Sequence, residues 1–294
     1  MIDLHVHTRI TDNSLSAREV IKQAKKRGIR YLAITDHDTT KGLKEAIEYG
    51  YELGVEIIPG IEISAYDYKR YKRAHILGLY IEPGHLELEY LCKPLIESRN
   101  KVSYEMVTRL IAEGYDISWE DVQKYADGGT GVFKQHIMHA LMDRGYCDSI
   151  YCDLYKMLFR RGSNTEPQGL VYIPLEYVDA RAAIRAVREA GGIAVLAHPA
   201  QLNNYDAIEE WVELGLEGIE VFHPSHRQED IHTSLIYAQK HNLVITGGSD
   251  HHGFYGELPV ELGCPELNVS SIQELIRRKQ NRFYSEGSWP VTML

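Results

Sequence analysis

The feature that most constrains the fold of this chain is a set of short apolar runs that end in histidine or an acidic residue. Eight runs are typical of β-strands, and several are continuously apolar, which indicates burial on both faces, as in a parallel sheet covered by helices. They span residues 2–6, 30–35, 55–58, 61–65, 74–81, 192–197, 217–222 and 242–247. Helical patterns lie between most of them, so the sequence predicts a barrel-like α/β domain.

The alternation of strands and helices is interrupted once. Between about residues 90 and 173 only helical patterns occur, over 94–113, 119–126, 134–144 and 149–161. We interpret this segment as a helical insertion in the barrel. The predicted organisation is therefore a first barrel part at residues 1–89, a helical cap at 90–173 and a second barrel part at 174–294.

Composition and the first residues exclude several classes of protein. The net charge of −10 argues against binding of long nucleic acid, which requires clustered Lys and Arg. The chain enters a strand at once and has no run of about 18 apolar residues, so we expect a cytoplasmic protein that does not bind a membrane. Its four cysteines lack C-x-x-C spacing and are expected to be free thiols.

The first strand carries an H-x-H pattern. A period of two sends Asp3, His5 and His7 to one face, and Ile2, Leu4 and Val6 to the other. The two histidines then lie about 7 Å apart, close enough to bind one metal ion. Taken alone, the pattern fits two exposed strand histidines equally well.

Other strands supply further ligand candidates. Because the C-terminal ends of parallel barrel strands open on one face, side chains that follow different strands would converge there. Glu62 lies within an apolar strand, where an unpaired carboxylate is costly, so we expect it to bridge ions. Asp12 could instead be a turn aspartate, and His75 a core histidine. The complete set is His5, His7, Asp12, His37, Glu62, His75, His198, Asp250 and His252.

The chemistry of this set narrows the cofactor and the reaction. Imidazole and carboxylate ligands without thiolate suit Mn, Fe or Zn better than Ca or Cu. Neighbouring divalent ions lower the pKa of a bound water and stabilise the charge of a phosphoryl group under attack. We therefore expect two or three divalent ions and a hydrolytic reaction that uses a metal-activated hydroxide.

The motifs HVHTRITD, ITDHD, GIE, AHILGL, AHP and GSDHHG resemble those of the polymerase and histidinol phosphatase (PHP) family of metal-dependent phosphoesterases. The similarity covers roughly residues 1–82 and 172–265. It implies a distorted (β/α)7 barrel with a helical insertion. It also implies three ligand groups: His5, His7, Glu62 and Asp250 for one ion; Glu62, His75 and His198 for a second; Asp12, His37 and His252 for a third.

Within the family, the chain is similar to the branch of nucleotide 3',5'-bisphosphate phosphatases and of a 5'-to-3' exoribonuclease for short RNA. The resemblance implies substrate-phosphate contacts at Arg99 and His136. The stretch Phe133-Lys134-Gln135-His136 stands where Gly-Arg-Pro-His is usual. Lys134 keeps the charge of that arginine but not its bidentate geometry. We expect catalytic roles for Asp12, His37, Glu62, His198 and His223, and His223 is also a candidate phosphate contact.

The leading hypothesis is a phosphoesterase for phosphomonoesters of nucleotides, such as 3',5'-bisphosphates, or for short oligonucleotides, in a monomer or small homo-oligomer. A phosphatase for histidinol phosphate or another small molecule is an alternative. A second alternative is an amidohydrolase, but its usual bridging carboxylated lysine has no counterpart in the predicted strand at residues 74–81. The third alternative is a non-enzymatic module that metal ions only stabilise. Structural metal sites of that kind are closed and commonly rich in cysteine.

Overall fold

The computed structural model describes residues 1–163, 165–264 and 266–286. Its centre is a curled sheet with the strand order β1, β2, β3, β4, β6, β7, β8, and the short β5 pairs with β3. The strands are β1 (Ile2–Val6), β2 (Tyr31–Ile34), β3 (Glu56–Asp67), β4 (Lys72–Leu79), β5 (Val178–Asp179), β6 (Ile193–Leu196), β7 (Leu216–Phe222) and β8 (Val244–Gly247). The prediction of a distorted barrel in an α/β fold is confirmed.

The sheet curls until its two outer strands approach each other. The backbone N–H of Asp250 donates to the carbonyl of His5 at 2.9 Å, and that of His7 donates to the carbonyl of His251 at 3.3 Å. These bonds join β1 to the segment that follows β8. They bring the first and last sequence motifs to the same place.

One strand runs against the others. β4 is antiparallel to both β3 and β6, whereas the pairs β1–β2, β2–β3, β6–β7 and β7–β8 are parallel. The expectation that every strand ends at the same face is therefore wrong for β4. The reason is the short turn between β3 and β4, because a tight connection joins antiparallel strands while a parallel pair needs a long crossover. The two runs expected at 55–58 and 61–65 form the single strand β3.

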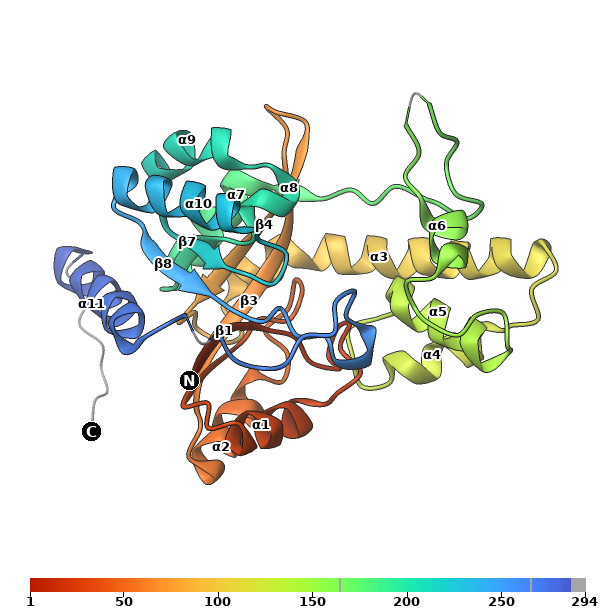
Figure 1. The fold of residues 1–294 in the computed structure, drawn as a ribbon, viewed down its shortest axis with the longest axis horizontal. Helices are drawn as coiled ribbons and strands as arrows, with labels where there is room; N and C mark the ends of the chain where they lie inside the picture. The colour runs from red at the N-terminus through yellow and green to blue at the C-terminus, as the bar shows by residue number, and fades with distance from the viewer. Residues whose placement is uncertain (164, 265, 287–294) are drawn as a thin grey trace.

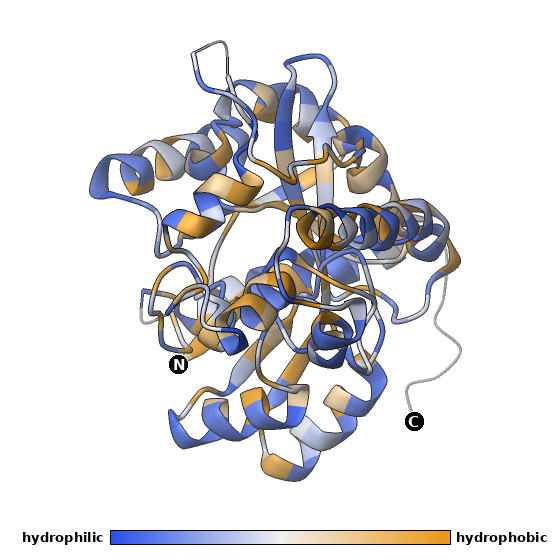
Figure 2. Ribbon diagram, turned by 90° about the vertical axis from the view of Figure 1, so that its right-hand side faces the viewer, coloured by the Kyte–Doolittle hydropathy of each residue, from blue (hydrophilic) through white to orange (hydrophobic). Residues whose placement is uncertain are grey.

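Helices cover the outside of this sheet. They are α1 (Ala17–Lys26), α2 (Leu43–Leu53), α7 (Ala180–Glu189), α8 (Pro199–Leu202), α9 (Ile208–Glu213), α10 (Gln228–His241) and α11 (Val269–Glu286). Their hydrophobic and hydrophilic residues alternate along the ribbon, as expected of helices that bury one face (Figure 2). On α1, for example, Val20, Ile21 and Ala24 are buried. No helix among the described residues combines the length and apolarity that a bilayer crossing requires.

The helical insertion projects from one end of the barrel (Figure 1). It contains α3 (Leu86–Ala112), α4 (Trp119–Gln123), a short 3-10 helix (Lys124–Ala126), α5 (Lys134–Asp143) and α6 (Asp153–Phe159). These helices share a hydrophobic cluster that includes Met106, Leu110, Ile137, Leu141 and Leu158. We call this part of the chain the cap; the division into domains at residues 90 and 173 stays a prediction.

The start of α3 was predicted too late in the sequence. Pro94 lies inside the helix, although proline normally opens a helix or ends one. Leu88, Cys92 and Leu95 are all buried, so packing continues without a break across the proline. Tertiary contacts therefore outweigh the missing backbone donor.

The inside of the barrel is filled by apolar side chains below the functional motifs. Leu4, Ile58, Leu77 and Val195 belong to one buried cluster with Leu275 of α11. Figure 1 shows α11 and the cap at opposite ends of the molecule. The barrel is thus closed at the end of α11 and meets the cap at the other.

Gly248 is a position where the fold admits no side chain. A Cβ atom there would lie 2.4 Å from Cβ and 2.5 Å from N of His5. We expect Gly248→Ala to lower the free energy of unfolding by about 1 to 3 kcal/mol, because the overlap must be relieved by moving a strand. It should also reduce the metal content after dialysis, since His5 is displaced.

Gly28→Ala is the matched control. Gly28 has φ +72°, and no atom lies within 4 Å of a Cβ there, so the cost should be the backbone strain alone, about 1 to 2 kcal/mol. Its metal content should equal that of the unchanged chain. Chemical unfolding and elemental analysis check both variants, and a Gly248→Ala protein that keeps its stability and metal content would contradict the close packing.

Candidate metal centre

His5 and His7 reach the same side of β1 through a local irregularity. The register of β1 against β2 shifts by one residue between Asp3 and Val6. Leu4 consequently packs inside the barrel while Val6 packs against the outer helices, so the expectation that they share a face is wrong. Asp3 does not join the histidines either, because its carboxylate accepts hydrogen bonds from Ser249 instead. A bulge of this kind re-aims side chains without ending the strand.

The first ligand group lies at the end of β1. His5 and His7 are completely buried, and their Nε2 atoms are 3.3 Å apart. Oε2 of Glu62 lies 3.2 Å from Nε2 of His5 and 3.1 Å from Nε2 of His7. Oδ1 of Asp250 lies 3.4 and 3.1 Å from the same two atoms. Four side chains therefore present ligand atoms to one small volume.

Glu62 also faces a second group of histidines. Its Oε1 lies 2.7 Å from Nδ1 of His75 and 3.0 Å from Nε2 of His198, and its Oε2 lies 3.3 Å from Nδ1 of His37. His75 reaches this place because the β3–β4 hairpin pairs it with Ser64, two residues beyond Glu62. The antiparallel strand thus delivers its histidine from the middle of the hairpin rather than from a strand end.

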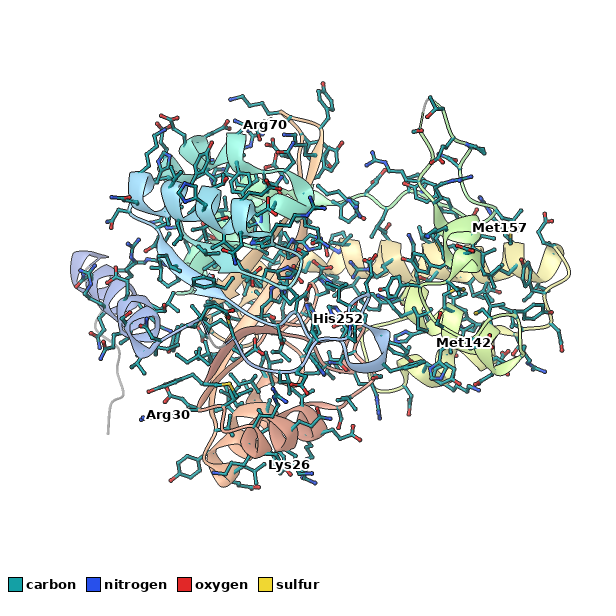
Figure 3. All side chains as sticks on the ribbon, in the orientation of Figure 1. Lys26, Arg30, Arg70, Met142, Met157 and His252 are labelled. Atoms are coloured by element: carbon teal, nitrogen blue, oxygen red, sulfur yellow. The ribbon has the colours of Figure 1, made fainter. Side chains whose placement is uncertain are left out.

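Asp12 is the centre of the third group. Its carboxylate oxygens lie 3.8 Å from Nδ1 of His7, 3.8 Å from Nε2 of His37 and 3.5 Å from Nε2 of His252. His252 lies where the barrel meets the cap (Figure 3). All nine side chains expected as ligands are therefore brought together.

The charges of these groups suit bound cations. Asp12, Glu62 and Asp250 are ionic partners of histidines, and in the described part of the chain no Lys or Arg contacts them. Burial alone would raise the pKa of Glu62, but the charges on His5, His75 and His37 outweigh it and hold that pKa well below its usual range. Buried carboxylates require such compensation, and a divalent ion would supply it.

Several ligand atoms also have unused capacity. Nδ1 of His7, Oδ1 of Asp12, Nδ1 of His198 and Oδ1 of Asp250 are buried without a hydrogen-bond partner in the described structure. Unpaired buried polar atoms are rare in proteins, and a bound ion is one explanation for them. The donor set of imidazole and carboxylate fits Mn, Fe or Zn.

Glu220 is a functional candidate that sequence reasoning missed. It is fully buried on β7, and its Oε1 lies 3.1 Å from Nδ1 of His5. It also accepts a hydrogen bond at 2.8 Å from the backbone N–H of His198. A carboxylate behind a ligating imidazole fixes the orientation of the ring. Its signal was an acidic residue within the apolar run 217–222, the same signal that pointed to Glu62.

Arg99 of α3 reaches the metal centre from the cap. Its guanidinium donates to Oδ2 of Asp38 at 2.7 Å and to Oγ of Ser64 at 3.3 Å, and it stacks on the ring of Phe133 at 4.6 Å. Asp38 in turn accepts from the N–H of Ser64 at 2.7 Å. This network fixes one side of the guanidinium beside His37.

The other phosphate-contact candidates occupy different places. His223 lies behind Asp250, with its Nε2 3.2 Å from Oδ2 and its Nδ1 2.7 Å from Oγ of Ser225. His136 is fully buried in α5, where Nδ1 accepts from the backbone N–H of Phe133 and Nε2 has no partner among the described residues. Burial lowers the pKa of His136 to about 4, so its ring is neutral.

Two cavities meet at the metal centre and share Asp12, His37, His75 and Gln135. The larger, of about 650 Å³, extends between the β3–β4 hairpin and the cap, and Arg99 and Lys134 line it. The smaller, of about 470 Å³, is lined by His198, His223 and Asp250. His37 and His75 are therefore open to a small molecule from the cap side. The four cysteines are free, as predicted.

Comparison with known proteins gives a consistent result. The PHP domain family matches residues 3–189. The chain is 44% identical over 257 residues to phosphoribosyl 1,2-cyclic phosphate 1,2-diphosphodiesterase of Eggerthella lenta, covering 87% of this chain and 96% of that protein. It is 31% identical over 256 residues to 3',5'-nucleoside bisphosphate phosphatase of Chromobacterium violaceum, covering 85% and 87%.

A solved structure agrees with these relatives. A protein of Bifidobacterium adolescentis, provisionally named a metal-dependent phosphoesterase, superimposes with a TM-score of 0.83 at 29% identity. The match covers 94% of this chain and 96% of the other. Its likeness therefore includes both the barrel and the cap.

Removing the charge of Glu220 should weaken the metal centre without removing a ligand. In Glu220→Gln the partner of His5 Nδ1 loses its charge, and changes behind a ligating imidazole typically cost 10- to 100-fold in metal affinity. Titration of the metal-free protein with Mn²⁺ or Zn²⁺ measures this effect. The same substitution at the exposed Glu213 is the control and should change nothing. Equal affinities of the two variants would refute the role given to Glu220.

Proposed function

Because this chain belongs to the PHP domain family and is a metal-dependent phosphoesterase, we propose that it hydrolyses a phosphate ester on a small ribose compound that carries a second phosphate. The observation that carries this proposal is that the ligand side chains lie at one end of a cavity under the cap whose wall also contains cationic side chains. The names of both relatives above describe sugars that bear two phosphates, which supports the same substrate class.

We assign the nine ligand side chains to two or three ions of Mn, Fe or Zn. The geometry supports groups around His5 and His7, around Glu62 and around Asp12, with His7, His37 and Glu62 each adjoining more than one group. Bound divalent ions supply an acidified water and neutralise charge on the phosphoryl group. Glu62 has both oxygens against different histidines, which favours the bridging role proposed for it.

Arg99 is the residue best placed to hold the reacting phosphate. Asp38 and Ser64 engage one of its terminal nitrogens, which leaves its other N–H groups for an anion in the larger cavity. A preorganised donor of this kind stabilises charge that develops on the phosphoryl oxygens. The ring of Phe133 supports the guanidinium from the side of α5.

We propose positioning roles for two histidines of the predicted catalytic and phosphate-binding sets. His223 holds Asp250 through its Nε2 and lines the smaller cavity. His136 ties the start of α5 to the backbone of Phe133. His136 therefore acts on the substrate through the residues that it orients.

The alternative reactions have less support. An amidohydrolase commonly uses a carboxylated lysine as its bridging ligand, but here the acidic residue Glu62 occupies the shared position. Lys72, at the start of β4, is bonded instead to Asp206 at 3.0 Å. A closed structural metal site would not open into two cavities. The cavity size favours nucleotides or short RNA over long nucleic acid, and a monomer or small homo-oligomer stays our expectation.

Substrate profiling tests the proposed function. Metal-free protein should be reconstituted with Mn²⁺, Fe²⁺ or Zn²⁺ and incubated with adenosine 3',5'-bisphosphate, a phosphoribosyl cyclic phosphate, short RNA and histidinol phosphate. We expect metal-dependent hydrolysis, with the highest kcat/KM for a ribose compound that carries two phosphates. Preference for histidinol phosphate, or absence of hydrolysis with every metal, would overturn the proposal.

Asp12→Asn separates a catalytic metal centre from a structural one. Because Asp12 faces three histidines but lies on a loop, the variant should lose about 10²- to 10³-fold in kcat while its unfolding transition shifts little. The exposed Asp148→Asn is the control for the same chemical change. Circular dichroism melting and steady-state kinetics provide the two readouts. A large loss of stability with turnover retained would indicate a structural centre.

A further inference from the structure

The β3–β4 hairpin carries one basic residue that differs from its neighbours. Lys69, Arg70 and Lys72 each contact a carboxylate, at 2.7, 2.8 and 3.0 Å respectively. Arg73 has no carboxylate within ion-pair distance among the described residues, and it lines the larger cavity. Figure 3 shows Arg70 at the outer end of this hairpin. Arg73 is the second residue of β4; its side chain is exposed toward the cavity opening, and no described carboxylate pairs with it.

The register of the hairpin places Arg73 next to the metal centre. Arg73 and His75 are two residues apart on β4, so their side chains project from the same face about 7 Å apart. The partners across the hairpin are Tyr66 for Arg73 and Ser64 for His75. We call each such pair across the hairpin a row. The row of Ser64 and His75 lies at the metal centre, and the row of Tyr66 and Arg73 lies outward of it and carries a cation without a carboxylate partner.

Lys134 supplies a second uncompensated cation on the opposite wall. It is the first residue of α5, where the helix dipole disfavours positive charge. Its ammonium lies over the rings of Phe159 and Tyr172, at 5.5 and 5.7 Å, and no carboxylate partner occurs among the described residues. Burial and the charge of Arg73 lower the pKa of Lys134 to about 8. The two cations thus line the same cavity.

The composition of the cavity wall agrees with an anion as the missing partner. Arg73, Arg99, Lys134 and Arg161 line it, against the carboxylates of Asp12 and Glu176. Arg99 is already held by Asp38, and Asp12 belongs to the metal centre. In a chain with a net charge of −10, this is a local concentration of positive charge.

We propose that Arg73 and Lys134 form a second anion subsite, which binds the phosphate of the substrate that is not hydrolysed. This inference rests on the proposed function and specifies its substrate class, a ribose with two phosphate groups. One phosphate lies at the metal centre beside Arg99, and the other lies one row outward along the hairpin. Because side chains two residues apart on a strand lie about 7 Å apart, the two anion positions are neighbours along the hairpin.

The subsite determines specificity by its contribution to binding. Losing a hydrogen-bonded charge partner costs about 1.5 to 3 kcal/mol, which is about 10- to 100-fold in affinity. Arg73→Gln and Lys134→Met should each raise KM for adenosine 3',5'-bisphosphate by that factor. The KM for p-nitrophenyl phosphate, which has one phosphate, should rise by a much smaller factor. Arg185→Gln on the exposed side of α7 is the matched control.

A binding measurement separates this inference from the proposed function. Manganese-loaded Asp12→Asn protein is titrated calorimetrically with adenosine 3',5'-bisphosphate and with the 3'- and 5'-monophosphates. The bisphosphate should bind at least 10-fold more tightly than either monophosphate, and Arg73→Gln or Lys134→Met should remove that advantage. If the unchanged chain proves inactive, it is titrated directly. Retained preference in both variants, or no preference in the parent, overturns the subsite.

The pH dependence of binding gives an independent check. Lys134 shares the cavity wall with Arg73 of β4, Arg161 of the cap and the rings of Tyr155 and Tyr172, and burial raises the pKa of Tyr155 to about 12. Phosphate monoesters are already dianions at about pH 8. Affinity for the bisphosphate should therefore fall as the pH rises above about 8, where Lys134 loses its charge. Lys134→Arg should flatten this profile, and an unchanged profile contradicts the contact.

Discussion

The structure depends on the compensation of a buried carboxylate. Glu62 is 1% exposed and lies against imidazoles from β1, β4 and the segments that follow β2 and β6. An ionised carboxylate in such surroundings is stable only with positive charge around it, and histidines together with divalent ions provide that charge. The same requirement brings together side chains of β1, β3 and β4 and of the segments that follow β2 and β6. The folded barrel and the metal centre therefore both require that the charge of the buried Glu62 is compensated.

The β3–β4 hairpin links the metal centre to the proposed substrate-binding residues. Its antiparallel register pairs Ser64 with His75 at the metal centre and Tyr66 with Arg73 one row outward. Because side chains two residues apart on a strand share a face, the spacing between catalytic and binding rows is set by the backbone. The cap supplies Arg99 to the inner row and Lys134 to the outer one. In the proposed arrangement, the metal centre and the anion subsite thus lie along the same pair of strands.

Sequence reasoning found the parts of the site that strand alternation and strand ends encode. His5 and His7 converge as their spacing indicated, although a bulge rather than regular alternation directs them. The pattern of strand ends does not mark Glu220, because this residue lies inside the apolar run of β7. Pro94 marked a helix start by its local preference, which buried contacts on both sides override. Local patterns thus predicted which residues gather, while tertiary packing determined the elements that carry them.

The charge of Lys134 can differ between an empty and a filled cavity. A guanidinium there would remain charged against Arg73 and the helix dipole whatever the pH, because arginine does not deprotonate in proteins. An ammonium can release its proton instead, and its pKa of about 8 places that release near neutrality. An anion that binds beside Lys134 favours the charged form, so binding above that pH is coupled to proton uptake. The lysine therefore limits the electrostatic cost of the empty cavity, and in the proposed subsite it would make the affinity for a second phosphate sensitive to pH.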